Sequence, residues 1–197
     1  ADLSSLRVLI YGAAPMSADW ILRVAAAFPD AALFNCYGLT ETAPDLTIFD
    51  AQEFRAAIDR ARATGDCSGP LMSVGKPNVM NELRVIGTDG RELGVGEVGE
   101  LVARGRNMMT GYLNLPAETR DALRDGWFHT GDVARIDEAG YVYLLDRLKD
   151  LVITGGENVY SSEVEAVLVR HPAVAEAVII GVHDERLGEA VMAVRRA

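Results

Sequence analysis

The sequence predicts a mixed α/β fold with β-barrel-like and α+β parts. The first part of the chain reads as strand, helix and strand, the middle as short β-rich stretches separated by turns, and the last part as strands around one helix. We expect residues 1–66 to form a β-α-β portion and residues 67–147 a small antiparallel sheet or barrel. Residues 148–197 are then a hinge and an incomplete small α+β domain.

The first portion predicts two parallel strands. Residues 6–11 are a short apolar run, and Ser17 is placed to cap an apolar helix that reaches Phe28. Residues 31–37 read as the next strand. Because the crossover between such strands is right-handed, the two strands are expected to be parallel.

A second helix and a β-rich segment follow. Asp50 and Glu53 have the spacing of a capping box, and Gly65 is placed to end a helix that reaches about Ala63. Beyond this helix, turns separate short stretches with β propensity, which predicts the antiparallel sheet or barrel. Its expected strands are residues 83–86, 100–104, 133–136 and 141–145, with one helix near residues 117–123.

The last portion predicts an α+β unit. We expect a strand at residues 151–154, a break at Gly155 and Gly156, and a helix from about Ser162. Two further strands are expected at residues 174–182 and 190–194. The domain boundary is placed between Asp146 and Asp150.

Composition argues against several classes of partner. Nineteen Lys and Arg against 29 Asp and Glu give a formal net charge of -10, which opposes binding to nucleic-acid phosphates or anionic lipid. No apolar run reaches the roughly 20 residues of a membrane span, and no signal peptide is evident, so we expect a cytoplasmic protein without a transmembrane segment. Cys36, Cys67 and three scattered histidines predict neither a disulfide framework nor a Cys/His metal site.

Residues 69–76 partly match the sequence motif of a phosphate-binding loop. Such a loop needs four residues between its glycines and Ser or Thr after its Lys. Here five residues separate Gly69 from Gly75, and Pro77 follows Lys76. We therefore expect a turn that enters the sheet region.

A better nucleotide motif lies at the end of the second strand. Residues 35–41 bring together an aromatic face at Tyr37, a close backbone approach at Gly38, a hydroxyl for phosphate at Thr40 and an oxygen ligand for Mg²⁺ at Glu41. This segment and residues 12–15 both follow strand ends, where open α/β sheets bind ligands. An ordinary strand-to-helix turn with Thr40 as N-cap explains the motif equally well.

Three later segments also admit two interpretations. Asp132 supplies a carboxylate at a tight turn, which suits a ribose diol but also an Asx-type turn. Residues 146–150 are either a functional joint or a solvated linker. Residues 155–158 are either a functional glycine break or a simple turn.

Together these segments resemble the adenylate-forming superfamily of acyl-CoA synthetases, peptide-synthetase adenylation domains and luciferases. The resemblance covers nearly the whole chain, and within it residues 146–160 look most like bacterial medium- or long-chain fatty-acid-CoA ligases. Ser161 stands where many relatives have Pro. The resemblance implies that residues 1–147 are the C-terminal part of the large nucleotide-binding domain. Its five motifs are residues 11–15, 35–41, 99–112, 130–132 and 146–165.

The resemblance implies an ATP site in the first portion. Gly12, Ala13 and Ala14 would lie along the adenine, Asn35 would face its amino edge, and Tyr37 would stack on it.

Catalytic and hinge residues are implied as well. Thr40 would contact phosphate oxygens, Glu41 would hold Mg²⁺, and Asp132 would take the ribose hydroxyls. Arg147 would reach the ribose from the domain junction. Lys149 matches the hinge about which the small domain turns.

The implied reaction joins a carboxylic acid, expected to be a fatty acid, to coenzyme A. The carboxylate attacks the α-phosphate of ATP, which gives acyl-AMP and pyrophosphate, and the CoA thiol then attacks the acyl group. Gly155 and Gly156 would let the pantetheine thiol approach. Mg²⁺ and fixed hydrogen-bond donors stabilise the charge that develops in both steps.

Two parts of the family's machinery are not found in the sequence. These are the Ser/Thr/Gly-rich phosphate loop and the C-terminal catalytic Lys, so we expect part of an enzyme that is inactive alone. One alternative is an adenylation domain that loads a carrier-protein thiol. Another is a non-catalytic nucleotide-binding remnant.

Overall fold

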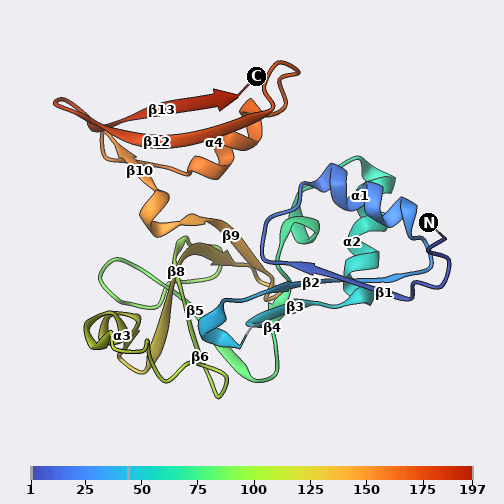
Figure 1. Cartoon of the computed structure of the whole chain (residues 1–197), viewed down its shortest axis with the longest axis horizontal. Coiled ribbons are helices and arrows are strands. Elements are labelled where there is room, and N and C mark those ends of the chain that lie inside the picture. Colours follow the sequence, from blue (N-terminus) through green and yellow to red (C-terminus); the bar gives the residue numbers. More distant parts are fainter. Residues whose placement is uncertain (1, 44, 197) are drawn as a thin grey trace. The chain divides into compact units, whose positions relative to one another are not determined.

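The computed structural model describes residues 2–43 and 45–196 (Figure 1). The chain divides into two compact units, which we describe separately. Unit 1 comprises Ala1–Thr130 and Arg135–Tyr143, and unit 2 comprises Gly131–Ala134 and Leu144–Ala197. The predicted domain boundary near residue 147 stays a prediction, because compactness alone does not define a domain. The predicted mixed α/β fold class is confirmed.

Unit 1 begins with the predicted β-α-β arrangement. Strand β1 (Val8–Gly12) pairs in parallel with β2 (Ala32–Tyr37), and helix α1 (Ala18–Ala27) connects them. The sheet then continues with antiparallel strands in the order β1-β2-β3-β4. The last two strands are β3 (Thr47–Phe49) and β4 (Lys76–Pro77).

Capping residues set the limits of both helices in this part. The Ser17 side chain accepts from the Trp20 N–H at the start of α1. Helix α2 (Ala51–Thr64) begins at Asp50, whose carboxylate accepts from the N–H groups of Gln52 and Glu53, at 2.8 and 3.1 Å. Gly65 ends α2 in the left-handed conformation at φ 72°, where glycine carries no Cβ penalty.

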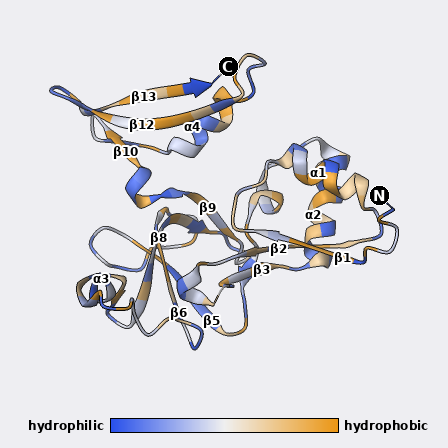
Figure 2. Ribbon diagram, viewed as in Figure 1, coloured by the Kyte–Doolittle hydropathy of each residue, from blue (hydrophilic) through white to orange (hydrophobic). Residues whose placement is uncertain are grey.

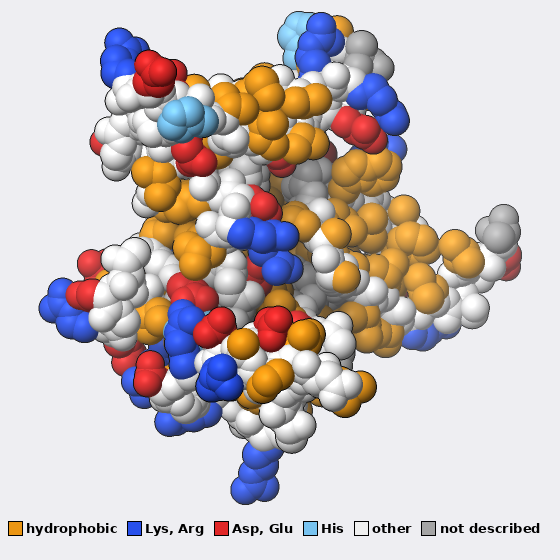
Figure 3. All heavy atoms as spheres, turned by 60° about the vertical axis from the view of Figure 1, so that its left-hand side comes forward, with side chains coloured by type: hydrophobic (Ala, Val, Ile, Leu, Met, Phe, Trp, Pro, Cys, Tyr) orange, Lys and Arg blue, Asp and Glu red, His pale blue; other side chains and the backbone are white. Residues whose placement is uncertain are grey.

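The core of this part lies between the helices and one face of the sheet. Phe49 and Phe54 are fully buried, with ring centres 4.7 Å apart. On the other face Val8 and Ile10 of β1 are 50% and 64% exposed. Figure 3 shows hydrophobic side chains gathered into patches on the face that it displays. Within the described residues, the helices therefore cover one face of the parallel pair.

The second sheet is the predicted β-rich region, and it curls into a half-barrel. Its strand order is β5-β6-β8-β7, with β9 paired to β8. Helix α3 (Pro116–Ala122) precedes the short strand β7. The strands are β5 (Asn81–Ile86), β6 (Gly99–Gly105), β7 (Leu123–Arg124), β8 (Trp127–Ile136) and β9 (Val142–Arg147).

One expectation in this region is wrong. Thr130, Gly131 and Asp132 do not form a tight turn but lie inside β8. Pairing with neighbouring strands keeps this stretch within β8, and the Thr130 hydroxyl donates to the Leu101 carbonyl at 2.7 Å. Gly131 has φ 70°, so it supplies a local irregularity of the kind that re-aims side chains in a strand.

Unit 2 contains a four-stranded antiparallel sheet and one helix. The strand order is β11-β10-β13-β12, and α4 (Ser161–Leu168) packs on β12. Figure 2 shows stretches of apolar residues along β12 and β13. The strands are β10 (Val152–Thr154), β11 (Glu157–Val159), β12 (Glu176–Asp184) and β13 (Gly188–Arg196).

Three short 3-10 helices complete the described structure: η1 (Thr40–Thr42), η2 (Gly69–Met72) and η3 (Leu148–Asp150). Among the described residues, no helix combines the length and the apolar character that crossing a membrane requires. The cytoplasmic location stays a prediction.

Replacing Asp50 with Ala should destabilise unit 1, because the two N–H groups at the start of α2 lose their acceptor. We expect a loss of about 1 kcal/mol in the free energy of unfolding, measured as a lower urea midpoint. Asp59→Ala is the matched control, since Asp59 is an exposed carboxylate in the interior of the same helix. Equal effects of the two substitutions would contradict the capping role.

Candidate functional site

The loop after β1 lies directly beside the end of β2. In the parallel pair, Tyr11 is the partner of Asn35 and Gly12 the partner of Cys36. A Cβ atom on Gly12 would stand 2.3 Å from the Cys36 carbonyl oxygen, so this approach admits only glycine. Ala13 follows with φ 66°. The predicted adenine-side residues from two sequence segments are therefore neighbours.

Asn35 and Tyr37 are held in place from several sides. Asn35 is 8% exposed, and its Nδ2 donates to the Ser73 carbonyl at 3.3 Å. The half-buried Tyr37 packs against the cluster around Leu46 and Phe128. Its carbonyl accepts from the Leu46 N–H at 2.7 Å.

The turn after β2 is a 3-10 helix closed by Thr42. The Thr42 hydroxyl donates to the Leu39 carbonyl and accepts from the Leu39 N–H, both at 2.9 Å. The alternative in which Thr40 serves as a helix N-cap is thus wrong, because Thr42 closes the turn. The Thr40 side chain is exposed beside Gly38.

Glu41 is fixed by a contact that sequence reasoning missed. The Tyr112 hydroxyl donates to Glu41 Oε1 at 2.7 Å, and the Met109 N–H donates to the Glu41 carbonyl at 2.7 Å. Desolvation and the Glu41 carboxylate raise the pKa of Tyr112 to about 12. Tyr112 stands in one of the motifs that carry the family resemblance, which is the signal that pointed to it without assigning a role.

A single carboxylate on this turn fits a magnesium ion whose remaining ligands are substrate phosphates and water. Within residues 2–43 and 45–196, no group of three or more His, Cys, Asp or Glu side chains is arranged to hold a metal ion. Mg²⁺ is commonly held by one or two carboxylates together with substrate phosphates and water. Glu41 can supply the protein's share of such a site.

In unit 2, the two predicted ribose residues meet. Asp132 is 4% exposed, and its Oδ1 lies 2.8 Å from Arg147 Nε. The ion pair holds the Asp132 carboxylate in one place, and a carboxylate is a strong acceptor for hydroxyl groups.

The start of the predicted joint, residues 146–150, is hydrogen-bonded to the start of helix α4. The Asp146 carboxylate accepts from the Arg147 N–H at 2.7 Å and from the Ser161 hydroxyl at 2.8 Å. The Ser162 hydroxyl donates to the Leu145 carbonyl. Lys149 lies beyond these contacts with its side chain exposed.

Gly155 and Gly156 form the two-residue turn between β10 and β11. Their φ angles are 58° and 88°, as the turns favoured in two-residue hairpins require. The Gly155 N–H donates to the Leu187 carbonyl at 2.9 Å. Both glycines are exposed, so a ligand can approach their backbone.

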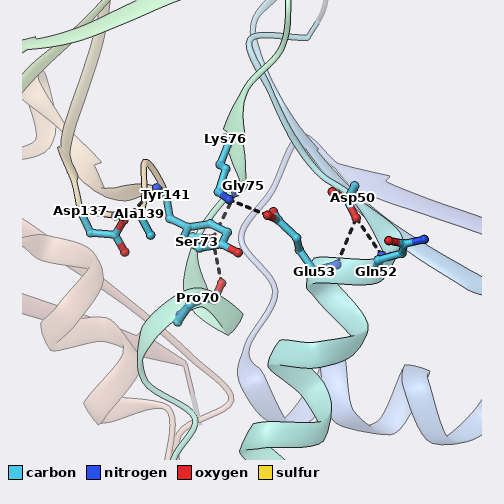
Figure 4. A network of polar contacts seen from close by, with 10 residues as sticks. All are labelled: Asp50, Gln52, Glu53, Pro70, Ser73, Gly75, Lys76, Asp137, Ala139 and Tyr141. Carbon is cyan, nitrogen blue, oxygen red and sulfur yellow. Dashed lines mark hydrogen bonds and ion pairs between the residues drawn. The ribbon is translucent and has the colours of Figure 1, made fainter.

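The segment that partly matches a phosphate-binding loop is a turn, as predicted. Lys76 Nζ donates to Glu53 Oε1 at 2.5 Å and lies 4.5 Å from the centre of the Tyr141 ring (Figure 4). Glu53 therefore pairs with Lys76 rather than completing the expected capping box with the Asp50 N–H. This hydrogen bond raises the pKa of Lys76. Lys76 thus joins α2 to β4.

The fold and these contacts define a protein that places an amide, an aromatic ring and a carboxylate at the carboxyl end of a parallel strand pair. The sequence model of the AMP-binding enzymes matches residues 1–113, and that of the AMP-binding enzyme C-terminal domain matches residues 163–195. The chain belongs to the family of AMP-binding enzymes, which confirms the resemblance read from its motifs.

Individual relatives match almost all of the chain. It is 42% identical over 196 residues to a feruloyl-CoA synthase from Amycolatopsis sp, covering 98% of this chain and 36% of that protein. It is 41% identical over 193 residues to the fatty acid–[acyl-carrier-protein] ligase ScoC from Streptomyces coeruleorubidus, covering 98% and 35%. The chain therefore spans about a third of the length of the curated relatives it matches.

A solved structure agrees in fold. The o-succinylbenzoate CoA synthetase MenE from Bacillus subtilis, in complex with its acyl-adenylate intermediate, matches with a TM-score of 0.80 at 32% identity, covering 97% of this chain and 36% of that one. A second structure of that enzyme contains ATP and a magnesium ion, and it matches with a TM-score of 0.79 over the same shares of both chains.

Two tyrosines should make the protein sensitive to alkaline pH. The pKa values of Tyr112 and Tyr143 are raised to about 12, mainly by desolvation, whereas unfolded tyrosines ionise near pH 10. A raised folded-state pKa gives stability that is complete below about pH 10 and is lost as the pH rises toward 12. We expect urea unfolding midpoints to fall across this interval, and to fall less in Tyr143→Phe. An identical decline in that variant would contradict the assignment.

Proposed function

We propose that this chain is part of an ATP- and Mg²⁺-dependent acyl-CoA ligase. The enzyme would activate a carboxylic acid as acyl-AMP and transfer the acyl group to the thiol of CoA. The observation that carries the proposal is the meeting of the Gly12 loop with Asn35 and Tyr37 at the carboxyl end of the β1–β2 pair, in a chain that belongs to the AMP-binding enzymes.

The adenine would lie between this loop and the end of β2. Gly12, Ala13 and Ala14 offer an exposed backbone strip with small side chains, which suits the flat face of a base. The Asn35 amide oxygen would accept from the adenine amino group. The Tyr37 ring would stack on the base, an interaction worth roughly 1–3 kcal/mol for a nucleic-acid base on an aromatic side chain.

The ribose would be held by the Asp132 and Arg147 pair. The buried carboxylate would accept hydrogen bonds from the two ribose hydroxyls, and the ion pair with Arg147 would orient it. Because both residues lie in unit 2, the pair is in place without any assumption about how the two units are arranged.

The phosphates would meet the turn η1. The Thr40 hydroxyl, which is exposed, would donate to a phosphate oxygen, and Glu41, whose carboxylate accepts from Tyr112, would hold Mg²⁺. When bound, the ion neutralises phosphate charge and orients the α-phosphate. An oxygen of the substrate carboxylate attacks the α-phosphorus and pyrophosphate leaves.

The second step would use unit 2. The CoA thiolate attacks the acyl carbonyl carbon, and AMP leaves with the electron pair of the acyl–oxygen bond. The exposed glycine turn at Gly155 and Gly156 has no side chain to block the pantetheine arm. Lys149, exposed in η3, is the proposed hinge residue.

A second acceptor is favoured by one observation. ScoC, named as an acyl-carrier-protein ligase, is almost as similar to this chain as the feruloyl-CoA synthase. In this second candidate function, the acyl group goes to the thiol of a separate carrier protein instead of CoA. The adenylation step is unchanged. Among acids, we propose a fatty acid, with aromatic acids as the first alternative because feruloyl-CoA synthase is among the relatives.

The full-length protein should form a thioester from ATP, CoA and a carboxylic acid. The assay uses a panel of short-, medium- and long-chain fatty acids and cinnamate-type aromatic acids, with CoA or a holo carrier protein as the acceptor. Product with CoA supports the ligase. Product with the carrier protein alone supports the second candidate. Absence of acid-dependent pyrophosphate release across the panel would exclude both.

Replacing Asp132 with Ala should weaken ATP binding by the full-length protein. Losing hydrogen bonds to a charged acceptor costs about 1.5–3 kcal/mol, which corresponds to a roughly 10- to 100-fold higher Kd in calorimetry. Glu138→Ala is the control, because Glu138 is an exposed carboxylate in a surface turn. An unchanged Kd in Asp132→Ala would remove the ribose role.

A further inference from the structure

The loop after β6 holds the turn η1 at three points. Asn107 Nδ2 donates to the Thr42 carbonyl at 2.6 Å, and the Met109 N–H donates to the Glu41 carbonyl at 2.7 Å. The Tyr112 hydroxyl donates to Glu41 Oε1 at 2.7 Å. Both the backbone and the side chain of Glu41 are therefore positioned by residues about 70 places later in the chain, all within unit 1.

The bond from Tyr112 restricts the Glu41 carboxylate to one orientation. A Glu side chain has several freely rotating bonds, and ordering it costs conformational entropy. With Oε1 engaged by the hydroxyl, Oε2 is the oxygen left for a cation.

Tyr112 is itself held by helix α3. Its N–H donates to Thr119 Oγ1 at 2.9 Å, and the Thr119 hydroxyl donates to the Leu115 carbonyl at 2.7 Å. At Gly111, with φ 150°, a Cβ atom would stand 2.7 Å from Thr119 Cγ2. This close approach fixes the backbone from which the Tyr112 ring extends toward Glu41.

We propose that Tyr112 is a positioning residue that orients the Glu41 carboxylate toward the magnesium ion of bound ATP, and that Thr119 fixes Tyr112 for this purpose. The inference rests on the proposed function, since it takes Glu41 as the metal ligand. Outer hydrogen-bond partners of metal ligands typically change metal affinity or activity by 10- to 100-fold when they are replaced.

The test measures ATP binding by the full-length protein as a function of Mg²⁺ concentration. Tyr112→Phe removes only the hydroxyl, and we expect the Mg²⁺ concentration for half-maximal ATP binding to rise roughly 10-fold or more. Glu41→Gln should raise it at least as much. Thr119→Val should give a smaller increase. Thr119→Ser keeps the hydroxyl, so its Mg²⁺ concentration for half-maximal ATP binding should equal that of the wild-type protein.

Tyr143→Phe is the matched control. The Tyr143 hydroxyl also donates to a carboxylate, Asp137, at 2.9 Å, and the pKa of Tyr143 is likewise raised to about 12. We expect this variant to lower the urea midpoint without changing the Mg²⁺ requirement. Tyr112→Phe with a wild-type Mg²⁺ requirement, or an equal shift in Tyr143→Phe, would overturn the inference.

The two proposals fail in different ways. Mg²⁺-dependent ATP binding that responds to Tyr112→Phe, without thioester formation from any acid, supports the role of Tyr112 and removes the ligase proposal. ATP binding that is independent of Mg²⁺ in the wild-type protein overturns the role of Tyr112, while thioester formation then still stands as a separate result.

Discussion

The parallel pairing of β1 with β2 is the constraint on which the rest of the candidate site depends. The register sets Gly12 beside Cys36, at a distance that admits no side chain on Gly12. The register therefore places the loop that follows β1 beside the segment that follows β2. Helix α1 allows this pairing by crossing over one face of the sheet, and the aromatic core around Phe49 and Phe54 holds the helices against that face.

Contacts between residues far apart in the sequence orient the acidic side chains of the candidate site. The segment after β2 is a single 3-10 turn, which Thr42 closes locally, but the Glu41 carboxylate on this turn is positioned by Tyr112 from the loop after β6. In unit 2, a carboxylate inside a strand is likewise set by an arginine that is distant in sequence. In both cases a partner outside the motif decides how the acidic group is presented.

Local signals were enough to predict most elements. Ser17, Asp50 and Gly65 mark helix ends because capping is a short-range interaction between a side chain and nearby N–H or C=O groups. Gly155 and Gly156 marked the break after the strand at residues 151–154, because glycine adopts positive φ without a Cβ penalty, but the strand β11 that follows was not predicted. The expected tight turn around Gly131 was wrong because pairing with neighbouring strands, which no local pattern reveals, keeps that stretch within β8.

The sequence by itself determined the family, the β-α-β unit and the residue types of the site, since these depend on order along the chain and on short-range chemistry. Only the tertiary structure decided which groups those residues contact. Lys76 could have faced phosphate but pairs with Glu53, and Glu41 receives its orientation from Tyr112. The physical reason is that hydrogen bonds and ion pairs act over about 3 Å in space, whatever the separation along the chain.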